Sequence, residues 1–143
     1  MRWRDRQFWL AMAAGPMFWV AYAWLAKQPP NWSGPTNWVG FLYVALVTPV
    51  IEEWVFRGWL QGHLLPERFR RTKWVGLTQA NIITSIVFVS LHFLYHPPLW
   101  AASVLFPSLL FGYFRDRHKG IGACVALHIF FNMGFFWLFA ELR

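Results

Sequence analysis

The chain has 143 residues, of which 57% are hydrophobic and 21% aromatic, while 13% are charged. A soluble domain carries about 25% charged residues, so this composition excludes a disordered chain and argues against an ordinary soluble domain. The formal net charge of +7 would suit a nucleic-acid-binding protein, but the cations are spread over several segments and no nucleic acid partner is expected.

Four uncharged stretches are each long enough for at least one membrane span of about 20 residues. They cover residues 7–26, 28–51, 74–114 and 120–140. The third would be about 60 Å long as one helix, twice the hydrocarbon thickness, so it must fold back on itself. Pro97 and Pro98 mark the break, because tandem prolines lack backbone donors and disfavour helix before them.

The sequence therefore predicts an all-α fold, a polytopic membrane helical bundle with about five transmembrane helices. The expected spans cover residues 8–26, 38–60 or slightly beyond, 76–95, 99–114 and 120–140. We expect a single membrane domain over 1–143, in which the first span precedes a four-helix core over 38–140. The first span also has features of a signal peptide, with three preceding arginines, but its apolar run exceeds the usual 7–15 residues.

With five spans, the connecting segments alternate between the two sides of the membrane. Ten cations fall on one side: Arg2, Arg4, Arg6, Arg68, Arg70, Arg71, Lys73, Arg115, Arg117 and Lys119. Only Lys27 and Arg143 fall on the other side. The positive-inside rule therefore predicts a multi-pass protein of the cell (inner) membrane, with the N-terminus in the cytoplasm and the C-terminus outside.

Several expected spans contain polar side chains that lipid should exclude. Ionisable groups within spans cost a few kcal/mol each, so they are candidates for function. The set comprises Glu52, Glu53, Arg57, His92 and His128, together with the uncharged Asn132.

The two glutamates face different surroundings. Glu53 and Arg57 stand at positions i and i+4, a favourable arrangement for a helical ion pair, and we expect them to neutralise each other. Glu52 points about 100° away and has no cation in its own turn. It must therefore be protonated, hydrated or held by another span.

The two histidines lie on polar stripes of other spans. Asn81, Ser85, Phe88 and His92 share one helical face, as do Cys124, His128 and Asn132. Glu52, His92, His128 and Asn132 come to similar depths if the second span extends past Leu60. Each polar residue alone is compatible with an interhelical hydrogen bond, and Phe88 with a core position. Four polar residues at similar depth on three spans instead favour a functional site.

The same residues carry a family resemblance. Residues 52–57 resemble a Glu-Glu-x-x-x-Arg signature, residues 88–92 resemble Phe-x-x-x-His, and residues 128–132 resemble His-x-x-x-Asn. These are motifs of the CPBP family of CAAX proteases and bacteriocin-processing proteins, also called the Abi family, which includes Rce1-type prenyl-protein proteases. All three motifs occur in the family order on successive core spans.

The resemblance implies a glutamic-type intramembrane endopeptidase with a membrane-embedded or membrane-anchored protein or peptide as substrate. Glu52 and His92 would activate a water, and His128 and Asn132 would stabilise the oxyanion. Glu53 and Arg57 would support the site, as would Phe88 of the second motif. Neither a prenylated protein nor an exported protein with a C-terminal sorting signal is singled out as the substrate.

The residues themselves agree with this chemistry. Amide hydrolysis needs a base for water, a donor for the leaving nitrogen and donors for the oxyanion, and the candidate residues supply all three. No cofactor is expected, but Glu52, His92 and His128 also form a possible zinc set with water as fourth ligand. A non-catalytic bacteriocin-immunity or membrane scaffold protein is the third interpretation.

Overall fold

The structure is a computed structural model that describes residues 4–139. Its helices are α1 (Arg6–Ala26), α2 (Trp38–Leu42), α3 (Thr48–Glu53), α4 (Glu67–Arg71), α5 (Gln79–His92), α6 (Pro98–Ser103), α7 (Leu105–His118) and α8 (Gly122–Phe139). A π-helical segment, Tyr43–Val47, joins α2 to α3, and a second, Trp54–Leu64, extends α3. Together they form one continuous helix, Trp38–Leu64, which we call the long helix. The strands are β1 (Lys73–Trp74) and β2 (Leu77–Thr78).

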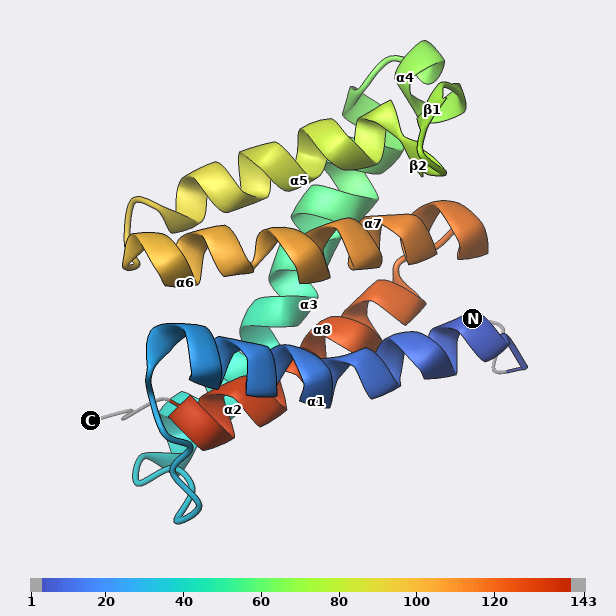
Figure 1. The fold of residues 1–143 in the computed structure, drawn as a ribbon. Coiled ribbons are helices and arrows are strands. Elements are labelled where there is room, and N and C mark those ends of the chain that lie inside the picture. The colour runs from blue at the N-terminus through green and yellow to red at the C-terminus, as the bar shows by residue number, and fades with distance from the viewer. Residues whose placement is uncertain (1–3, 140–143) are drawn as a thin grey trace.

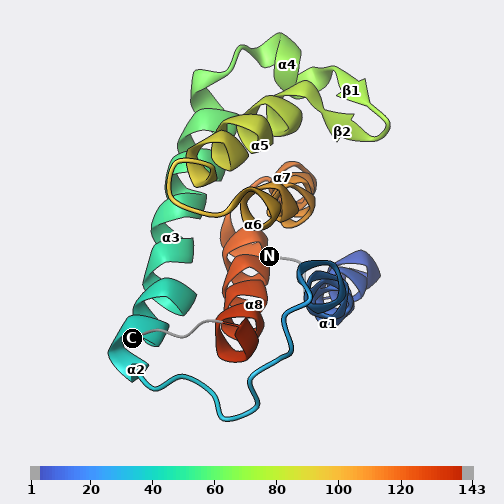
Figure 2. The ribbon, with the colours of Figure 1, turned by 60° about the vertical axis from the view of Figure 1, so that its left-hand side comes forward.

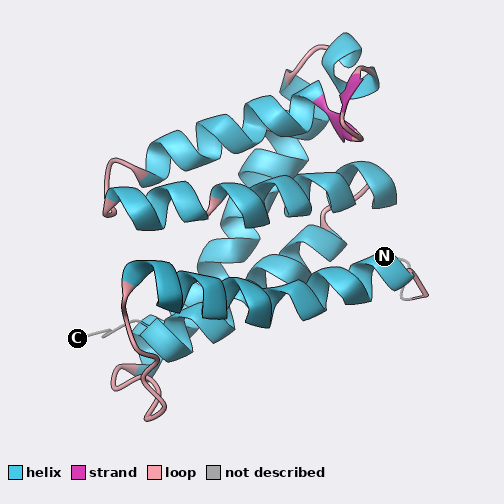
Figure 3. Ribbon diagram, in the orientation of Figure 1, coloured by secondary structure: helices cyan, strands magenta, loops and turns pink. Residues whose placement is uncertain are grey.

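The all-α fold predicted from the sequence is confirmed (Figure 3). Within residues 4–139, three helices are long and apolar enough to cross a membrane: α1, the long helix and α8. The apolar helix α5 has 14 residues, and the expected fourth span is divided at Val104 into α6 and α7. The protein is thus a helical membrane protein, and a count of five spans stays a prediction.

The long helix reaches Leu64, beyond the Leu60 limit on which the predicted alignment of the polar residues depended. Its first π-helical segment, Tyr43–Val47, is followed two residues later by Pro49 of α3. In a π-helix each N–H donates to the carbonyl five residues earlier, as Thr48 does to Tyr43. Pro49 has no N–H to continue this pattern, so the carbonyl of Val44 must find its partner on another helix.

α8 occupies the centre of the bundle. In Figure 2 it lies between the long helix and α1, and it also packs against α7. The core there consists of tightly packed apolar side chains, among them Phe8, Phe111, Phe114, Leu127 and Phe131. Because α8 contacts three neighbours, its polar stripe faces protein rather than lipid.

The two ends of the bundle differ. In Figure 1 the start of α1, the β-hairpin and the end of α7 lie on the right, whereas the α5–α6 loop and the end of α8 lie on the left. At the right-hand end, the carboxylate of Asp5 accepts hydrogen bonds from Arg117 and His118, the latter at 2.9 Å. These bonds tie α1 to α7 and hold the pKa of Asp5 well below its usual range.

Candidate active site

The four residues predicted to be catalytic line a single cavity of about 300 Å³. Glu52 comes from the long helix, His92 from α5, and both His128 and Asn132 from α8. Aromatic side chains form much of the remaining wall: Phe18, Phe88, Trp100, Phe111, Phe131, Phe135 and Phe136. The fold therefore brings together three motifs that are far apart in the sequence.

His128 connects the two adjacent glutamates. Its Nδ1 lies 2.9 Å from Glu53 Oε1, and its Nε2 lies 3.5 Å from Glu52 Oε2. The side chain of Glu53 is fully buried, whereas that of Glu52 is 25% exposed and borders the cavity. Glu52 thus receives from α8 the partner that its own helix lacks.

The predicted ion pair between Glu53 and Arg57 is present and fully buried, with 3.4 Å between Oε2 and Nε. Arg57 also donates from Nη2 to the backbone oxygen and the hydroxyl of Ser108, at 2.9 and 2.7 Å. Among the described residues, Glu53 Oε2 and Arg57 Nε and Nη1 accept or donate no hydrogen bond, so the charge of each side chain is balanced mainly by the other. The pairing matters because a buried charge that lacks a partner is strongly destabilising. The pair fastens the long helix to α7, and through His128 it also reaches α8.

Phe88 lies at the point where these groups meet. The guanidinium carbon of Arg57 is 5.6 Å from the centre of its ring. The same ring lies 4.4 Å from that of His92 and 6.1 Å from that of His128, measured between centroids. Phe88 therefore packs against both histidines and one face of the ion pair, which limits the rotation of all three side chains.

His92 is oriented by its own helix. Its Nδ1 lies 2.8 Å from the carbonyl oxygen of Phe88, so in the neutral ring Nδ1 is the donor and Nε2 the acceptor. The ring also stacks on Trp100 at 5.4 Å. This arrangement leaves Nε2 as the basic nitrogen available for chemistry at the cavity wall.

Asn132 has a structural bond as well as a place in the cavity. Its side-chain nitrogen donates to the carbonyl of Val44 at 3.0 Å, which is the carbonyl that Pro49 leaves unpaired in the π-helical turn. An amide NH₂ carries two hydrogens, so one further hydrogen bond can be directed at a ligand. The proline and the asparagine therefore fix the position of α8 against the long helix.

A second cavity of about 200 Å³ adjoins the first. Glu52, Phe88, His92 and His96 belong to the walls of both cavities. Glu52 and His92 therefore lie between the two cavities. The larger cavity has the aromatic wall described above, and the smaller one is also bordered by Tyr95.

Sequence reasoning missed part of this wall. His96 lies outside the three motifs and is not among the residues predicted for the site, yet its ring lies 3.9 Å from Trp100 and borders both cavities. The four-residue spacing between His92 and His96 could have indicated this, because residues four apart share a helical face. The helical hydrogen bonding does extend this far, since His96 N donates to His92 O. Within residues 4–139, no group of three or more His, Cys, Asp or Glu side chains has a spacing suited to a metal ion.

Comparison with known proteins identifies the family. A family model described as type II CAAX prenyl endopeptidase Rce1-like matches residues 34–134, which include all three motifs. No curated protein and no solved structure matches the chain. The matched range covers more than half of the 143 residues and contains every residue predicted to be catalytic or to support the site. The chain therefore belongs to the Rce1-like family of type II CAAX prenyl endopeptidases, which are membrane proteases.

Proposed function

We propose that this protein is a glutamic-type intramembrane endopeptidase that uses a water molecule activated by Glu52 and His92. The observation that carries the proposal is the placement of His128 beside both Glu52 and Glu53, at the wall of a cavity that His92 and Asn132 also line. A carboxylate, two imidazoles and an amide at one cavity supply a base and oxyanion donors without a nucleophilic side chain.

The reaction follows from these positions. Glu52 takes a proton from a water molecule held near His92 Nε2, and the water oxygen forms a bond with the scissile carbonyl carbon. Asn132 donates a hydrogen bond to the oxyanion that develops, and so does His128 through Nε2–H. Because His128 Nδ1–H faces the Glu53 carboxylate, this role requires the ring to carry a proton on both nitrogens. As the carbon–nitrogen bond breaks, the proton held by Glu52 passes to the leaving nitrogen. Glu53 and Arg57 act through His128 and Phe88 by keeping them in place.

The substrate we propose is a membrane-embedded or membrane-anchored protein or peptide. The aromatic wall of the cavity suits an apolar segment. We further propose that the protein lies in the cell (inner) membrane with its N-terminus in the cytoplasm. This orientation is supported by the basic residues at the start of α1, around the hairpin and at the end of α7, which share one end of the bundle (Figure 1).

Turnover by purified protein in detergent, with a labelled library of membrane-anchored peptides, tests the mechanism. We expect no cleavage by Glu52→Gln or His92→Ala, and a loss of about 10²–10³ in kcat for Asn132→Ala. Substrate capture should persist in all three. Glu67→Gln, which alters an exposed ion pair with Arg71, is the matched control and should retain full activity.

The same assay separates the two alternatives. Full turnover in a strong chelator is expected, and a strict requirement for added zinc would instead assign Glu52, His92 and His128 as metal ligands. If Glu52→Gln keeps the full biological activity of the protein in cells, the chain is a non-catalytic immunity or scaffold protein.

A further inference from the structure

A polar cavity of about 260 Å³, which shares no lining residue with the candidate active site, lies at the end of the bundle where the basic residues gather. It is formed by α4, the β-hairpin and the end of α7. Arg70, Lys73, Arg117 and Lys119 line it, together with one carboxylate, that of Asp116. This is the opposite composition to the aromatic cavity of the candidate active site.

The charges around this cavity are not balanced. Arg70 uses Nη1 to bond the carbonyls of Gly62 and Leu65, at 2.8 and 3.3 Å, which neutralises no charge. Asp116 accepts a hydrogen bond from the hydroxyl of Thr78 at 2.6 Å.

Three of the four cations lack an acidic partner. Arg117 is paired with Asp5. Among residues 4–139, no carboxylate lies within ion-pair distance of Arg70, Lys73 or Lys119. The cavity therefore retains a net positive charge and suits an anion.

The hairpin beside the cavity has an unusual tip. Lys73 pairs with Thr78 and Trp74 with Leu77, which leaves a two-residue turn of Val75 and Gly76. Both have positive φ, +48° and +83°, the pattern of a type I′ turn. Asn-Gly is the usual choice there, and a β-branched residue at positive φ is strained.

The strained residue is also fully exposed, as is much of the tryptophan before it. Val75 has a relative exposure of 104% and Trp74 of 70%, and Figure 2 shows the hairpin projecting beyond α5 and α7. An indole and an aliphatic side chain at such a tip suit the boundary between lipid headgroups and acyl chains. A tip inserted at that boundary would bring the basic cavity to the surface of the membrane.

We propose that this cavity binds the phosphate group of an anionic membrane phospholipid, while Trp74 and Val75 contact its acyl chains. Lys73 and Lys119 supply the charge for the phosphate, and the adjacent apolar tip favours a lipid over free phosphate. Basic pockets at this membrane face are suited to acidic lipid headgroups. The lipid would hold the hairpin and the end of α7 at the interface, independently of catalysis.

Binding to the purified full-length protein in detergent tests the ligand. Dioctanoyl phosphatidylglycerol, dioctanoyl phosphatidylcholine and inorganic phosphate are titrated, with the thermal unfolding midpoint and the lipid retained in native mass spectrometry as readouts. We expect phosphatidylglycerol to raise the midpoint and to be retained at one molecule per chain. An equal rise with inorganic phosphate would identify a free-anion site, and an equal rise with phosphatidylcholine would identify apolar contact alone, so either result overturns the proposal.

Paired variants of equal charge test the cavity. The double variant Lys73→Gln with Lys119→Gln should bind phosphatidylglycerol about tenfold more weakly or worse. Arg4→Gln with Arg68→Gln removes two exposed cations outside the cavity and should change binding little. If both double variants lose the same affinity for phosphatidylglycerol, binding depends only on general surface charge, and the proposal of a specific site is overturned.

The tip is tested by Val75→Asn. This change relieves the strained turn, so it should raise the unfolding midpoint in the absence of lipid. It also removes the apolar side chain, so the added rise with phosphatidylglycerol should shrink. A Val75→Asn protein that keeps the full lipid response would contradict the proposed role of the tip, and neither result depends on proteolytic activity.

Discussion

His128 is the residue through which the three motifs interact. Its two ring nitrogens lie beside the carboxylates of Glu52 and Glu53, and its ring stacks on Phe111 with 4.8 Å between centroids. Rotation of this ring would therefore break the contact with the proposed base and with the buried ion pair together. The two glutamates differ in consequence: Glu53 and Arg57 hold His128 in place, while Glu52 faces the cavity.

This division predicts different outcomes for two substitutions. Arg57→Ala leaves Glu53 buried without its cation, which typically costs about 3–5 kcal/mol, so the protein should accumulate poorly in membranes. Glu52→Gln keeps the shape of a partly exposed side chain, so it should accumulate normally and cleave no substrate. Quantitative immunoblotting of membranes with matched turnover assays measures both effects. Equal abundance combined with equal loss of turnover would contradict the division.

At the scale of the elements, the long helix and α8 are joined by a defect in the helical hydrogen bonding. Pro49 leaves the Val44 carbonyl without an intrahelical donor in the π-helical turn, and Asn132 supplies one from α8. The hydrogen bond between the two helices therefore depends on the proline, which frees the carbonyl that Asn132 binds. A purely α-helical segment at this point would leave Asn132 without an acceptor there.

Pro49→Ala tests this coupling. Alanine provides a backbone N–H that can donate a hydrogen bond to the Val44 carbonyl within the long helix. The side chain of Asn132 then competes for this acceptor and is held less firmly. We expect an unchanged or higher unfolding midpoint together with slower turnover, because a proposed oxyanion donor is no longer fixed. Pro16→Ala in α1 is the control, since Pro16 lies outside the catalytic cavity. Turnover equal to that of the unaltered protein would show that the bond from Asn132 does not position it for catalysis.

The contact between α5 and α7 requires glycine at position 112. A Cβ there would overlap the side-chain amide of Asn81, which donates to Leu109 O at 2.9 Å and accepts from Ser85. Gly112→Ala should therefore destabilise the protein by about 1–3 kcal/mol, as overpacking does in well-packed cores.

Gly122→Ala is the matched control for this packing. A Cβ at position 122 meets no atom within 4 Å, so the substitution should be neutral or slightly stabilising. The unfolding midpoints of the two variants in one detergent give the comparison. Similar midpoints would mean that α5 and α7 separate easily.

The helices and the candidate site residues could be predicted from the sequence because lipid penalises charged and polar groups. Exclusion of charge from lipid marks the spans, and the cost of burying polar groups marks Glu52, His92, His128 and Asn132. The contact of His128 with Glu53 could not be predicted in this way, because it depends on the rotation of α8 against the long helix. The break at Val104 was also missed, since it lies within an uncharged stretch with no glycine or tandem proline at that point. The β-hairpin was missed because its turn lacks the usual Asn-Gly pair.

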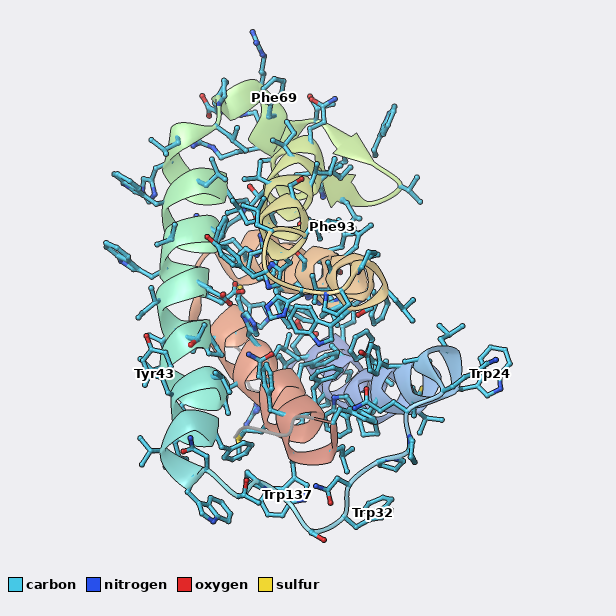
Figure 4. All side chains as sticks on the ribbon, turned by 90° about the vertical axis from the view of Figure 1, so that its left-hand side faces the viewer. Trp24, Trp32, Tyr43, Phe69, Phe93 and Trp137 are labelled. Carbon is cyan, nitrogen blue, oxygen red and sulfur yellow. The ribbon has the colours of Figure 1, made fainter. Side chains whose placement is uncertain are left out.

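At the scale of the whole molecule, the two ends of the bundle differ: most cations lie at one end, and Trp24 and Trp32 are exposed at the other. Figure 4 places Trp24 and Trp32 at the margin of the molecule, with relative exposures of 79% and 78%. Trp24 lies near the end of α1, and the chain there is held to α8 by a bond from Gln28 to Phe139 O at 3.0 Å. Exposed indoles at this end and Trp74 at the other match the aromatic residues expected at both membrane interfaces, and cations at one end are the pattern expected when that end lies in the cytoplasm.

This asymmetry leads to a prediction for the topology. Reporter fusions after Lys27, near Arg70, near Pro98, after Arg117 and at Arg143 should read outside, inside, outside, inside and outside. The physical reason is that ten cations would otherwise have to be translocated, whereas the opposite side carries two. Lys27→Gln should leave every reading unchanged, because it removes a cation from the side that is already poor in them. A cytoplasmic reading at Arg143 would contradict the five-span arrangement, and an inside reading after Lys27 would locate the error in α1.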